Sequence, residues 1–406
     1  MSRKTSRRAF LRTAAAGAAA LTVVPRHVLG GPGYAPPSET LGGALIGCGG
    51  RGGGTFGGLG PGVRRLASCD VKYVETADNN TIYTDFRRVL ERKDIDVVAI
   101  ATPPHWHALI SIAAMQAGKD VLCEKPLTRF IAEGRAVVDA EKRYGRIMQV
   151  GTYGRYGEIR RPESIMVHKI MASGLLKNCE GVHIKRGGLK VKQWSGYVNP
   201  VPQPVPSWLD WDMYCGPAPL RPFHPHRHGG THRGYWDYEG GGLADMGQHH
   251  FDPVQWRYAK DATSAVEVES HAPPADALAC GMWGWVEMKY ADGMTFVMDS
   301  TEWGEGYSRK EAREVSLDDL DEESRKKVEA MPDPDPWPDF PEAVKTREKT
   351  GGCAEAAHRS ATILHLANIS IRVGRKIQYD PVKEEIIGDE EANRLVNQPM
   401  RAPWHL

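Results

Sequence analysis

The chain has 406 residues, and its 52 Lys and Arg nearly balance its 51 Asp and Glu, giving a formal net charge of +1. This balance gives no surface for nucleic acid or for anionic membranes, so we expect neither as a partner. No uninterrupted apolar run reaches about 18 residues, so we do not expect stable membrane insertion. The length suffices for two domains with substantial cores.

The first 31 residues have the organisation of an export leader. Ser6-Arg7-Arg8-Ala9-Phe10-Leu11 has the form of a twin-arginine motif, and an uncharged, Ala-rich run follows at 14–24. This run is too short to cross about 30 Å of hydrocarbon, but it suits the apolar region of a signal peptide. We therefore predict a twin-arginine signal over 1–31, export of the folded protein to the periplasm or another extracytoplasmic space, and an extended linker over 32–40.

Residues 41–150 alternate strand and helix patterns and are predicted to form an NAD-binding Rossmann domain. An apolar run at 41–46 leads into Gly47-Cys48-Gly49-Gly50-Arg51-Gly52, the strand–loop–helix fingerprint of dinucleotide binding. Asp70 ends the next apolar stretch, where an acid holds the ribose 2′-hydroxyl and repels a 2′-phosphate, so we expect NAD rather than NADP. Further strands are predicted at 96–101, 120–123 and 147–150, and helices at 83–91, 106–117 and 131–144. Such alternation predicts a doubly wound parallel sheet.

Beyond residue 150 the pattern changes to that of an α+β domain, predicted over 151–406. Helices are expected at 163–171 and 354–373, and strands at 182–186, 283–290 and 294–300. The alternating strands predict a large, mostly antiparallel open sheet. Residues 195–240 are rich in Pro, Gly, Trp and His, and a loop of this length is expected to be functional. Residues 310–350 are charged and Pro-rich, and we predict a surface excursion there.

Motifs in both halves carry a family resemblance. They are Ala101-Thr102-Pro103-Pro104-His105-Trp106-His107, Cys123-Glu124-Lys125-Pro126 and Gly241-Gly242-Leu243-Ala244-Asp245-Met246-Gly247-Gln248-His249. With the glycine loop, they resemble the signature of the glucose–fructose oxidoreductase / inositol dehydrogenase (Gfo/Idh/MocA) family over residues 41–406. The resemblance implies a Rossmann domain and a sheet domain that holds a sugar or polyol against a nicotinamide. We expect a tightly bound NAD and a homo-oligomer, a dimer or tetramer formed through the open sheet.

The motifs, the loop composition and the resemblance together assign residues to the site. The catalytic residues are expected to be Lys125, Asp245 and His249. Arg155, Arg233, Trp236, Tyr238 and His250 are expected to bind the substrate. The cofactor is expected to contact Gly47, Gly49, Gly50, Arg51, Gly52, Asp70, Thr102, Pro103, His107, Glu124, Lys125 and Gln149.

These residue types suit the oxidation of a secondary alcohol. The hydroxyl proton must leave as hydride leaves the carbon, and the pKa of an ordinary His lies close to working pH, which suits a base. A Lys ammonium at the oxygen stabilises the developing alkoxide. Asp245 would share a helical face with His249 and could orient its imidazole. Pro253 leaves this open, because its ring clashes with the carbonyl of His249 in a continuous helix; Asp252 could instead cap a helix that starts later.

The histidines at 224, 226, 228 and 232 do not predict a metal site. Their alternating spacing on a loop rich in Gly and Pro fixes no coordination geometry, and no Cys or carboxylate completes a ligand set. The seven cysteines are scattered without metal-binding spacing. We expect no metal and place these histidines at the mouth of the sugar pocket.

Three functions remain open. The first is a nicotinamide-dependent oxidoreductase acting on a secondary hydroxyl of a sugar, polyol or glycoside. The second uses the same site without net redox change. Oxidation gives a transient ketone that acidifies the neighbouring C–H, a group is then eliminated or the configuration changes, and the hydride returns. The family's NAD-dependent glycosidases follow this course. It needs a second base, for which Tyr153, His232, Tyr238 and His250 are candidates, and export favours it because no coenzyme pool exists outside the cytosol. The third is a non-catalytic sugar-binding protein, which Lys125, Asp245 and His249 argue against.

Overall fold

The computed structural model describes residues 40–73, 81–176 and 178–406. The predicted leader and all of the predicted linker except residue 40 lie outside these ranges. Within them, no helix combines the length and the apolar character needed to span a membrane.

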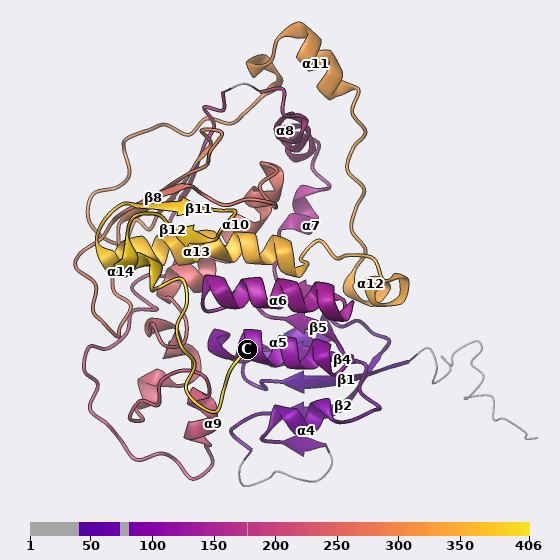
Figure 1. Ribbon diagram of the computed structural model, residues 1–406, viewed down its shortest axis with the longest axis vertical. Helices are drawn as coiled ribbons and strands as arrows, with labels where there is room; N and C mark the ends of the chain where they lie inside the picture. The colour runs from indigo at the N-terminus through magenta and orange to yellow at the C-terminus, as the bar shows by residue number, and fades with distance from the viewer. Residues whose placement is uncertain (1–39, 74–80, 177) are drawn as a thin grey trace, which may run out of the picture.

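Six parallel strands form the first sheet, in the order β3-β2-β1-β4-β5-β6 (Figure 1). This is the strand order of doubly wound dinucleotide-binding sheets, so the predicted Rossmann fold is confirmed. The buried strand β4 is a continuous apolar run, and β5 is apolar after Asp120, as expected where helices cover both faces of a sheet. The strands are β1 (Leu41–Ile46), β2 (Val63–Cys69), β3 (Ile82–Tyr83), β4 (Val97–Ile100), β5 (Asp120–Cys123) and β6 (Met148–Val150).

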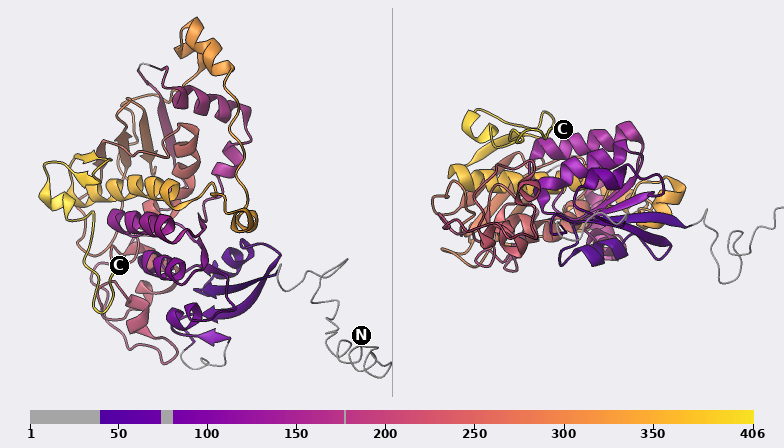
Figure 2. Two further views of the ribbon diagram at one scale, coloured as in Figure 1. Left: turned by 45° about the vertical axis from the view of Figure 1, so that its right-hand side comes forward. Right: turned by 90° about the horizontal axis from the view of Figure 1, so that it is seen from below.

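Helices cover both faces of this sheet. On one face α4 (Phe86–Leu90), α5 (His107–Gln116) and α6 (Ile131–Tyr144) bury their apolar sides. On the other face lie α3 (Gly52–Gly57) and α12 (Phe340–Thr346), as the left view of Figure 2 shows for α12 in orange. The prediction of a surface excursion over 310–350 is therefore wrong for α12. Its Phe340, Ala343 and Val344 share one helical face and are buried against the sheet.

The second crossover departs from its prediction. A single helix was expected over 83–91, but the structure has the short strand β3 followed by the shorter helix α4. Asp85 determines where the helix begins, because its extended backbone lies outside the helix and its carboxylate accepts from the N–H of Arg87.

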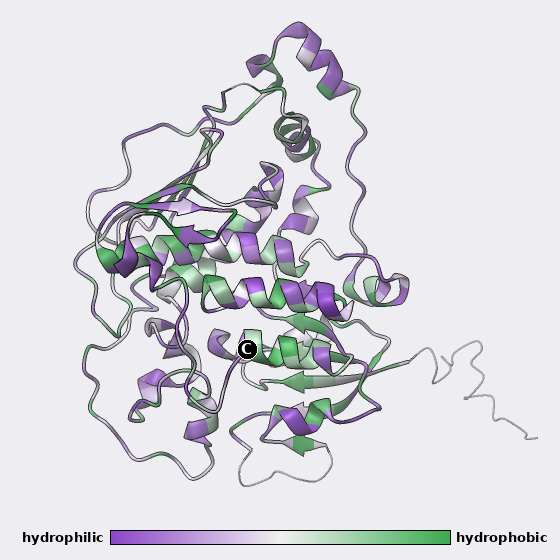
Figure 3. Cartoon of the chain, viewed as in Figure 1, coloured by the Kyte–Doolittle hydropathy of each residue, from purple (hydrophilic) through white to green (hydrophobic). Residues whose placement is uncertain are grey.

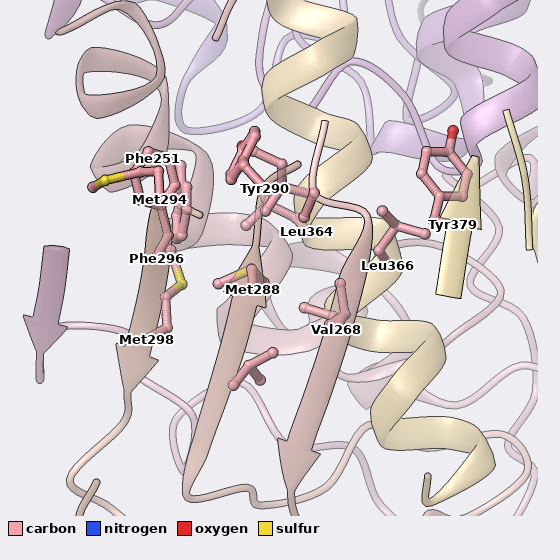
Figure 4. Packing of buried hydrophobic residues seen from close by; sticks show 14 of the residues in the cluster. Phe251, Val268, Met288, Tyr290, Met294, Phe296, Met298, Leu364, Leu366 and Tyr379 are labelled. Carbon is pink, nitrogen blue, oxygen red and sulfur yellow. The ribbon is translucent and has the colours of Figure 1, made fainter. Parts of the chain in front are cut away.

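The second sheet has six strands in the order β12-β11-β8-β9-β10-β7. Its pairs are antiparallel except β7 with β10, which confirms the mostly antiparallel prediction. The long helices α10 (Gly241–Arg257) and α13 (Ala354–Val373) pack on its inner face, where Phe251, Met288, Phe296 and Leu364 meet (Figure 4). The strands are β7 (Val182–Arg186), β8 (Glu267–His271), β9 (Trp285–Lys289), β10 (Thr295–Asp299), β11 (Ile377–Asp380) and β12 (Glu385–Ile386).

Shorter elements complete the second half. They are α7 (Arg155–Glu158), α8 (Pro162–Ser173), α9 (Trp211–Cys215), the 3₁₀ turns Pro225–Arg227, Gly229–Gly234 and Leu317–Asp319, α11 (Glu322–Glu329) and α14 (Glu390–Asn393), besides the 3₁₀ turn Pro104–Trp106 that precedes α5. Figure 3 shows that α11, at the top, is mostly hydrophilic, in contrast to the apolar strands of the first sheet. Residues 195–240 contain only α9 and 3₁₀ turns, as their composition indicated.

The outer face of the second sheet carries part of the chain itself. Tyr307 is buried against Trp285, the guanidinium of Arg309 lies 4.4 Å from the centre of the Trp285 ring, and Arg313 bridges to Val182. An oligomer formed through this sheet stays a prediction, and it would have to accommodate this segment.

Candidate active site

A cavity of about 870 Å³ lies between the first sheet and the loops and helix of the second half of the chain. The carboxyl ends of β1, β2, β4 and β5 form one wall, and α10 with residues of the 190–239 region forms the other. Ligands of open parallel sheets bind at these strand ends, where the strand order reverses. The cavity lies at that position, because β1 pairs with β2 on one side and with β4 on the other.

The glycine loop fits a dinucleotide. Gly47 has φ of +89°, and a Cβ there would lie 2.5 Å from the carbonyl carbon of Ala101, so no larger residue is accommodated. Nothing lies within 4 Å of a Cβ built on Gly49 or Gly50, and both line the cavity. The loop therefore leaves its backbone open to a pyrophosphate at the start of α3. Gly52 packs on the oxygen of Gly47 behind the loop and does not line the cavity.

Asp70 ties the glycine loop to the end of β2. Its carboxylate accepts from the backbone N–H of Cys48 at 2.6 Å and from that of Lys72 at 3.1 Å. The ammonium of Lys72 donates to the carbonyl of Cys48 at 2.8 Å. Asp70 lines the cavity, in the position where an acid would meet the ribose.

Glu124, Thr102 and Pro103 continue this wall. Thr55 and Arg51 both donate to Oε1 of Glu124, at 2.7 and 2.9 Å. The hydroxyl of Thr102 is buried and has no hydrogen-bond partner within the described residues.

Two residues expected at the cofactor lie behind the wall instead. His107 is fully buried, its ring nitrogens contact the carbonyls of Pro126 and Thr102 at 2.8 Å, and burial lowers its pKa. Gln149 accepts from the hydroxyl of Tyr156. Neither lines the cavity; His107 supports the backbone at Thr102 and Pro126, behind the wall.

Lys125 is held over the cavity by Asp245. Its ammonium donates to Oδ1 of Asp245 at 2.5 Å and to the carbonyl of the same residue at 2.6 Å. Nε of Arg233 lies 2.8 Å from the same Oδ1. Burial acts to raise the pKa of Asp245, but the two cations outweigh it and lower that pKa to about 2. The carboxylate therefore stays ionised and keeps the ammonium in place.

The helix α10 continues through Pro253, which settles the alternative left open by the sequence. The proline ring packs on α7's N-cap, Gly154, where a Cβ would lie only 2.7 Å from it. Asp245 and His249 therefore stand one turn apart on the same face, and both line the cavity. The expected orientation of His249 by Asp245 is corrected, since the carboxylate is engaged by Lys125 and Arg233. Burial and the charge of Lys125 lower the pKa of His249 to about 4.

Of the residues expected to bind the substrate, Arg233 lines the cavity and the others do not. Arg155 is fully buried and bonds Asp252 and Asp261 at 2.7 and 2.9 Å, so its placement at the substrate is corrected. Trp236 and Tyr238 are likewise buried in the protein, and the indole N–H of Trp236 donates to the carbonyl of Asp276. His250 follows His249 on α10 and therefore points away from the cavity, towards Gly188.

The sequence did not single out Glu239, Lys190, Trp194 or Tyr214, all of which line the cavity. No motif marks them, because long-range folding of the loops brings them there. His232 was a candidate second base; it lines the cavity, with Nε2 3.2 Å from Oε2 of Glu239. His228 also lines the cavity. His226 and His224 form local bonds instead: His226 contacts the hydroxyl of Tyr235, and His224 accepts from the N–H of His226. No cluster suited to a metal ion is present among the described residues.

Residues 209–238, here called the lobe, close one end of the cavity. The N–H of Asp210 donates to the carbonyl of Val71 at 3.0 Å, and Val71 packs on the lobe's aromatic cluster. The indole N–H of Trp106 donates to the carbonyl of Tyr214 at 3.2 Å. Tyr214 and His228 of the lobe line the cavity together with Asp70.

Comparison with known proteins identifies the family. Residues 64–152 match the NAD-binding Rossmann fold of the Gfo/Idh/MocA oxidoreductase family, and residues 162–406 match its C-terminal alpha/beta domain. The chain belongs to the Gfo/Idh/MocA family of oxidoreductases.

Curated relatives match over part of their length. Levoglucosan dehydrogenase of Pseudarthrobacter phenanthrenivorans is 36% identical over 122 residues, which are 30% of this chain and 29% of the relative. Inositol 2-dehydrogenase of Salmonella typhimurium is 34% identical over 119 residues, 26% of this chain and 34% of the relative. A glycosyl hydrolase family 109 protein of Shewanella pealeana is 29% identical over 215 residues, 41% of this chain and 47% of the relative. The chain thus spans under half of each.

Solved structures share the fold. The WlbA dehydrogenase from Bordetella pertussis, in complex with NADH and UDP-GlcNAcA, has a TM-score of 0.54 and 16% identity and covers 84% of this chain and 99% of its own. The WlbA dehydrogenase from Chromobacterium violaceum, with the same ligands, has a TM-score of 0.52, 16% identity and coverage of 84% and 96%. At this identity the likeness shows that the two-sheet architecture is shared.

Proposed function

We propose that this chain is an NAD-dependent oxidoreductase that takes hydride from a secondary hydroxyl carbon of a sugar, polyol or glycoside. The observation that carries the proposal is the position of Lys125, which Asp245 fixes at the strand ends beside Glu124 and His249. The names of the relatives support it, since levoglucosan and inositol are both cyclic polyhydroxy compounds.

The cofactor wall fits NAD. The open glycine backbone at Gly49 and Gly50 would hold the pyrophosphate, and Asp70 would accept from the ribose hydroxyls and repel a 2′-phosphate. Glu124 and Thr102 would border the nicotinamide end. When bound there, NAD supplies the hydride acceptor.

The residues of the opposite wall move and stabilise charge on the substrate. His249 takes the hydroxyl proton, because its lowered pKa keeps the imidazole neutral and able to accept one. Lys125 holds the oxygen and stabilises the developing alkoxide, and Asp245 positions Lys125. The lobe and α10 cover one side of the cavity.

We further propose that the cofactor is tightly held. The lobe contacts the end of β2 through Asp210 and Val71, so Tyr214 and His228 stand across the cavity from Asp70. These contacts would keep the lobe beside a dinucleotide seated on the glycine loop and so slow its release.

The direct test is to purify the protein without added coenzyme and identify what it carries by mass spectrometry. Myo-inositol, levoglucosan and aryl glycosides are then added, and the near-ultraviolet absorbance of reduced nicotinamide is followed. We expect bound NAD and its reduction by at least one of these compounds, with Lys125→Ala as the inactive control. NADP as the bound species would contradict the assignment of Asp70, and no reduction by any of them would contradict the proposed function.

A redox-neutral reaction at the same site is the second candidate. A tightly held cofactor would favour return of the hydride within one turnover, and the match to a glycosyl hydrolase family 109 protein supports this course. Release of an aryl group from a glycoside without net reduction of the cofactor would select it.

We also propose export by the twin-arginine route, on the strength of Arg7 and Arg8 ahead of an apolar run. Arg7→Lys combined with Arg8→Lys should retain the protein in the cytoplasm with unchanged cofactor content, measured by cell fractionation. Efficient export of the double variant would contradict this.

A further inference from the structure

Lys190 places an unpaired positive charge at the cavity. The residue is exposed and lines the cavity, so its ammonium is open to a ligand. Within the described residues this ammonium has neither an ion pair nor a hydrogen bond. The other Lys and Arg side chains of the lining each have a carboxylate partner, which balances their charge. These pairs are Arg51 with Glu124, Lys72 with Asp70, Lys125 with Asp245, and Arg233 with both Asp245 and Glu239.

The backbone holds Lys190 in a conformation that few side chains adopt. Its φ is +53°, in the left-handed region, which is unfavourable for a residue other than Gly, Asn or Asp. Its neighbours Leu189 and Val191 are 0% and 1% exposed, and the N–H of Trp194 donates to the carbonyl of Lys190 at 3.0 Å. These contacts fix the backbone on both sides of Lys190. Strained backbone that its surroundings hold in this way is concentrated at functional sites.

Lys190 lies about one helical turn from the group that fixes Lys125. Leu189 and Lys190 pack on Gly242, in the first turn of α10, where a Cβ would lie 2.1 Å from the carbonyl oxygen of Leu189. Asp245, which holds Lys125, follows Gly242 by three residues, or about 4.5 Å along the helix axis. The breadth of a sugar ring is similar, since its atoms are joined by bonds of about 1.5 Å. A sugar whose hydroxyl contacts Lys125 can therefore present another substituent to Lys190.

We propose that Lys190 binds a carboxylate of the substrate, and that the substrate class is an anionic sugar, a uronic acid or a glycoside of one. The inference rests on the proposed function, because it concerns the compound that is oxidised in the same cavity. The substrate is then held at two points, by Lys125 at the reacting hydroxyl and by Lys190 at the carboxylate. Lys190 thus restricts which ring hydroxyl reaches Lys125 and acts as a specificity-determining residue.

A lone ammonium on this wall favours a carboxylate over a phosphate. The guanidinium of Arg233 is turned towards other groups: its Nε lies 2.8 Å from Oδ1 of Asp245, and its Nη1 donates to the carbonyl of Gly230 at 3.0 Å. Arg233 therefore does not present the free fork that binds a phosphate through two parallel hydrogen bonds. A carboxylate carries a single negative charge, which the charge of Lys190 balances.

Equilibrium binding of D-glucuronate and D-glucose to the NAD-loaded protein tests this without requiring hydride transfer. The two sugars differ only in that glucuronate has a carboxylate where glucose has a hydroxymethyl group, and their Kd values are measured by isothermal titration calorimetry. We expect glucuronate to bind about 10–100-fold more tightly, the effect of a hydrogen bond to a charged group. Lys190→Asn, whose side chain suits the left-handed backbone, should lose this preference. Lys190→Arg should keep it, because the charge remains.

Lys192→Gln is the matched control. Lys192 is exposed on the same segment but does not line the cavity, so this variant should prefer glucuronate as the wild type does. The thermal midpoint and the NAD content of each variant separate a lost ion pair from a lost fold. Equal affinity of the wild type for the two sugars, an unchanged preference in Lys190→Asn, or a lost preference in Lys192→Gln would overturn the proposal.

Two further outcomes would assign the ammonium to a different anion. Tighter binding of glucose 6-phosphate than of glucuronate would overturn the choice of a carboxylate, and loss of NAD from Lys190→Asn would assign Lys190 to the cofactor instead. A protein that reduces its NAD with myo-inositol but binds glucuronate and glucose equally keeps the proposed function and loses this inference. A preference for glucuronate that depends on Lys190, without reduction of NAD by any sugar, leads to the opposite result.

Discussion

Two charged clusters stand on the same helix, α10, and they differ in what surrounds them. Asp252 and Arg155 are both 0% exposed, and Ser360 and Asp261 complete their contacts with hydrogen bonds and a second ion pair. Asp245, less than two turns of helix away, pairs with Lys125 and Arg233 at the cavity wall. The same residue types thus form a closed cluster at one position and an open one at the other.

The difference shows why residue type alone misplaced Arg155. A guanidinium near a sugar pocket suggested a substrate contact, but Arg155 already has two carboxylates and the carbonyl of Gly351 as partners. Arg233 has a free face on the cavity, where it lies over the ring of Trp194. Unsatisfied atoms at a cavity, rather than charge, distinguish the chemical site from the structural one.

The largest expected effect is at the open cluster. Lys125→Ala and His249→Ala should each lower kcat about 10²–10⁴-fold, because each acts on charge that develops in the transition state. NAD content and thermal midpoint should stay close to wild type. The double variant should be little slower than the slower single one, since the two groups act as a unit. Near wild-type turnover by His249→Ala would move the base elsewhere, and an unfolded variant would assign His249 a structural role instead.

A substitution in the closed cluster should lower the stability of the protein. Arg155→Ala leaves the buried side chain of Asp252 without its ion-pair partner, and such a loss typically lowers the free energy of unfolding by about 3–5 kcal/mol. Chemical denaturation of the two proteins measures this. Arg233→Ala is the matched variant, and it should lose far less stability because its side chain reaches solvent and Lys125 still pairs with Asp245. An equal loss of unfolding free energy in the two variants would contradict the distinction between the clusters.

A smaller effect is expected at the cofactor wall. Asp70→Ser removes a carboxylate at the end of β2 that would bind the ribose, a hydrogen bond to a charged group worth about 1.5–3 kcal/mol. We expect the Kd for NAD to rise about tenfold or more and the discrimination against NADP to fall, as titration of the cofactor-free protein would show. An unchanged preference for NAD would show that residues other than Asp70 determine it.

The smallest effect is on pH dependence. The pKa of His249 is lowered to about 4, so the imidazole stays a neutral base above that pH and the acid limb of kcat/KM should fall near pH 4 rather than near 6.5. The same shift makes stability fall as pH is lowered from about 6.5 to about 4, because the unfolded chain then binds a proton that the folded His249 does not. An acid limb near 6.5 would show that His249 is more accessible to water than the structure indicates.

Much of the fold was predictable because local patterns and tertiary packing agree. The helices 131–144 and 354–373 and the strands 41–46, 120–123 and 182–186 have the predicted bounds. The prediction stayed open at Pro253 and failed at α12, in both cases because packing outweighs local preference. Pro253 stays inside α10 because its ring fills the space beside Gly154, and α12 forms because the sheet offers its apolar residues a surface.

The candidate site was predictable only where a motif reports it. The glycine loop, Glu124-Lys125-Pro126 and the Asp245–His249 segment lead to residues that line the cavity. Glu239 and Trp194 lie in loops without periodicity, and they reach the cavity through contacts far apart in the sequence, such as Gly196 with Cys280. No spacing rule encodes such contacts.

The most direct test of the central claim is transfer of a labelled hydrogen. Myo-inositol and levoglucosan, each deuterated on their ring carbons, are incubated with the NAD-containing protein, and the cofactor is then released and analysed by mass spectrometry. The account predicts one deuterium on the reduced nicotinamide with at least one compound, and none with Lys125→Ala. A cofactor that stays unlabelled and oxidised with both compounds would contradict hydride transfer at this site.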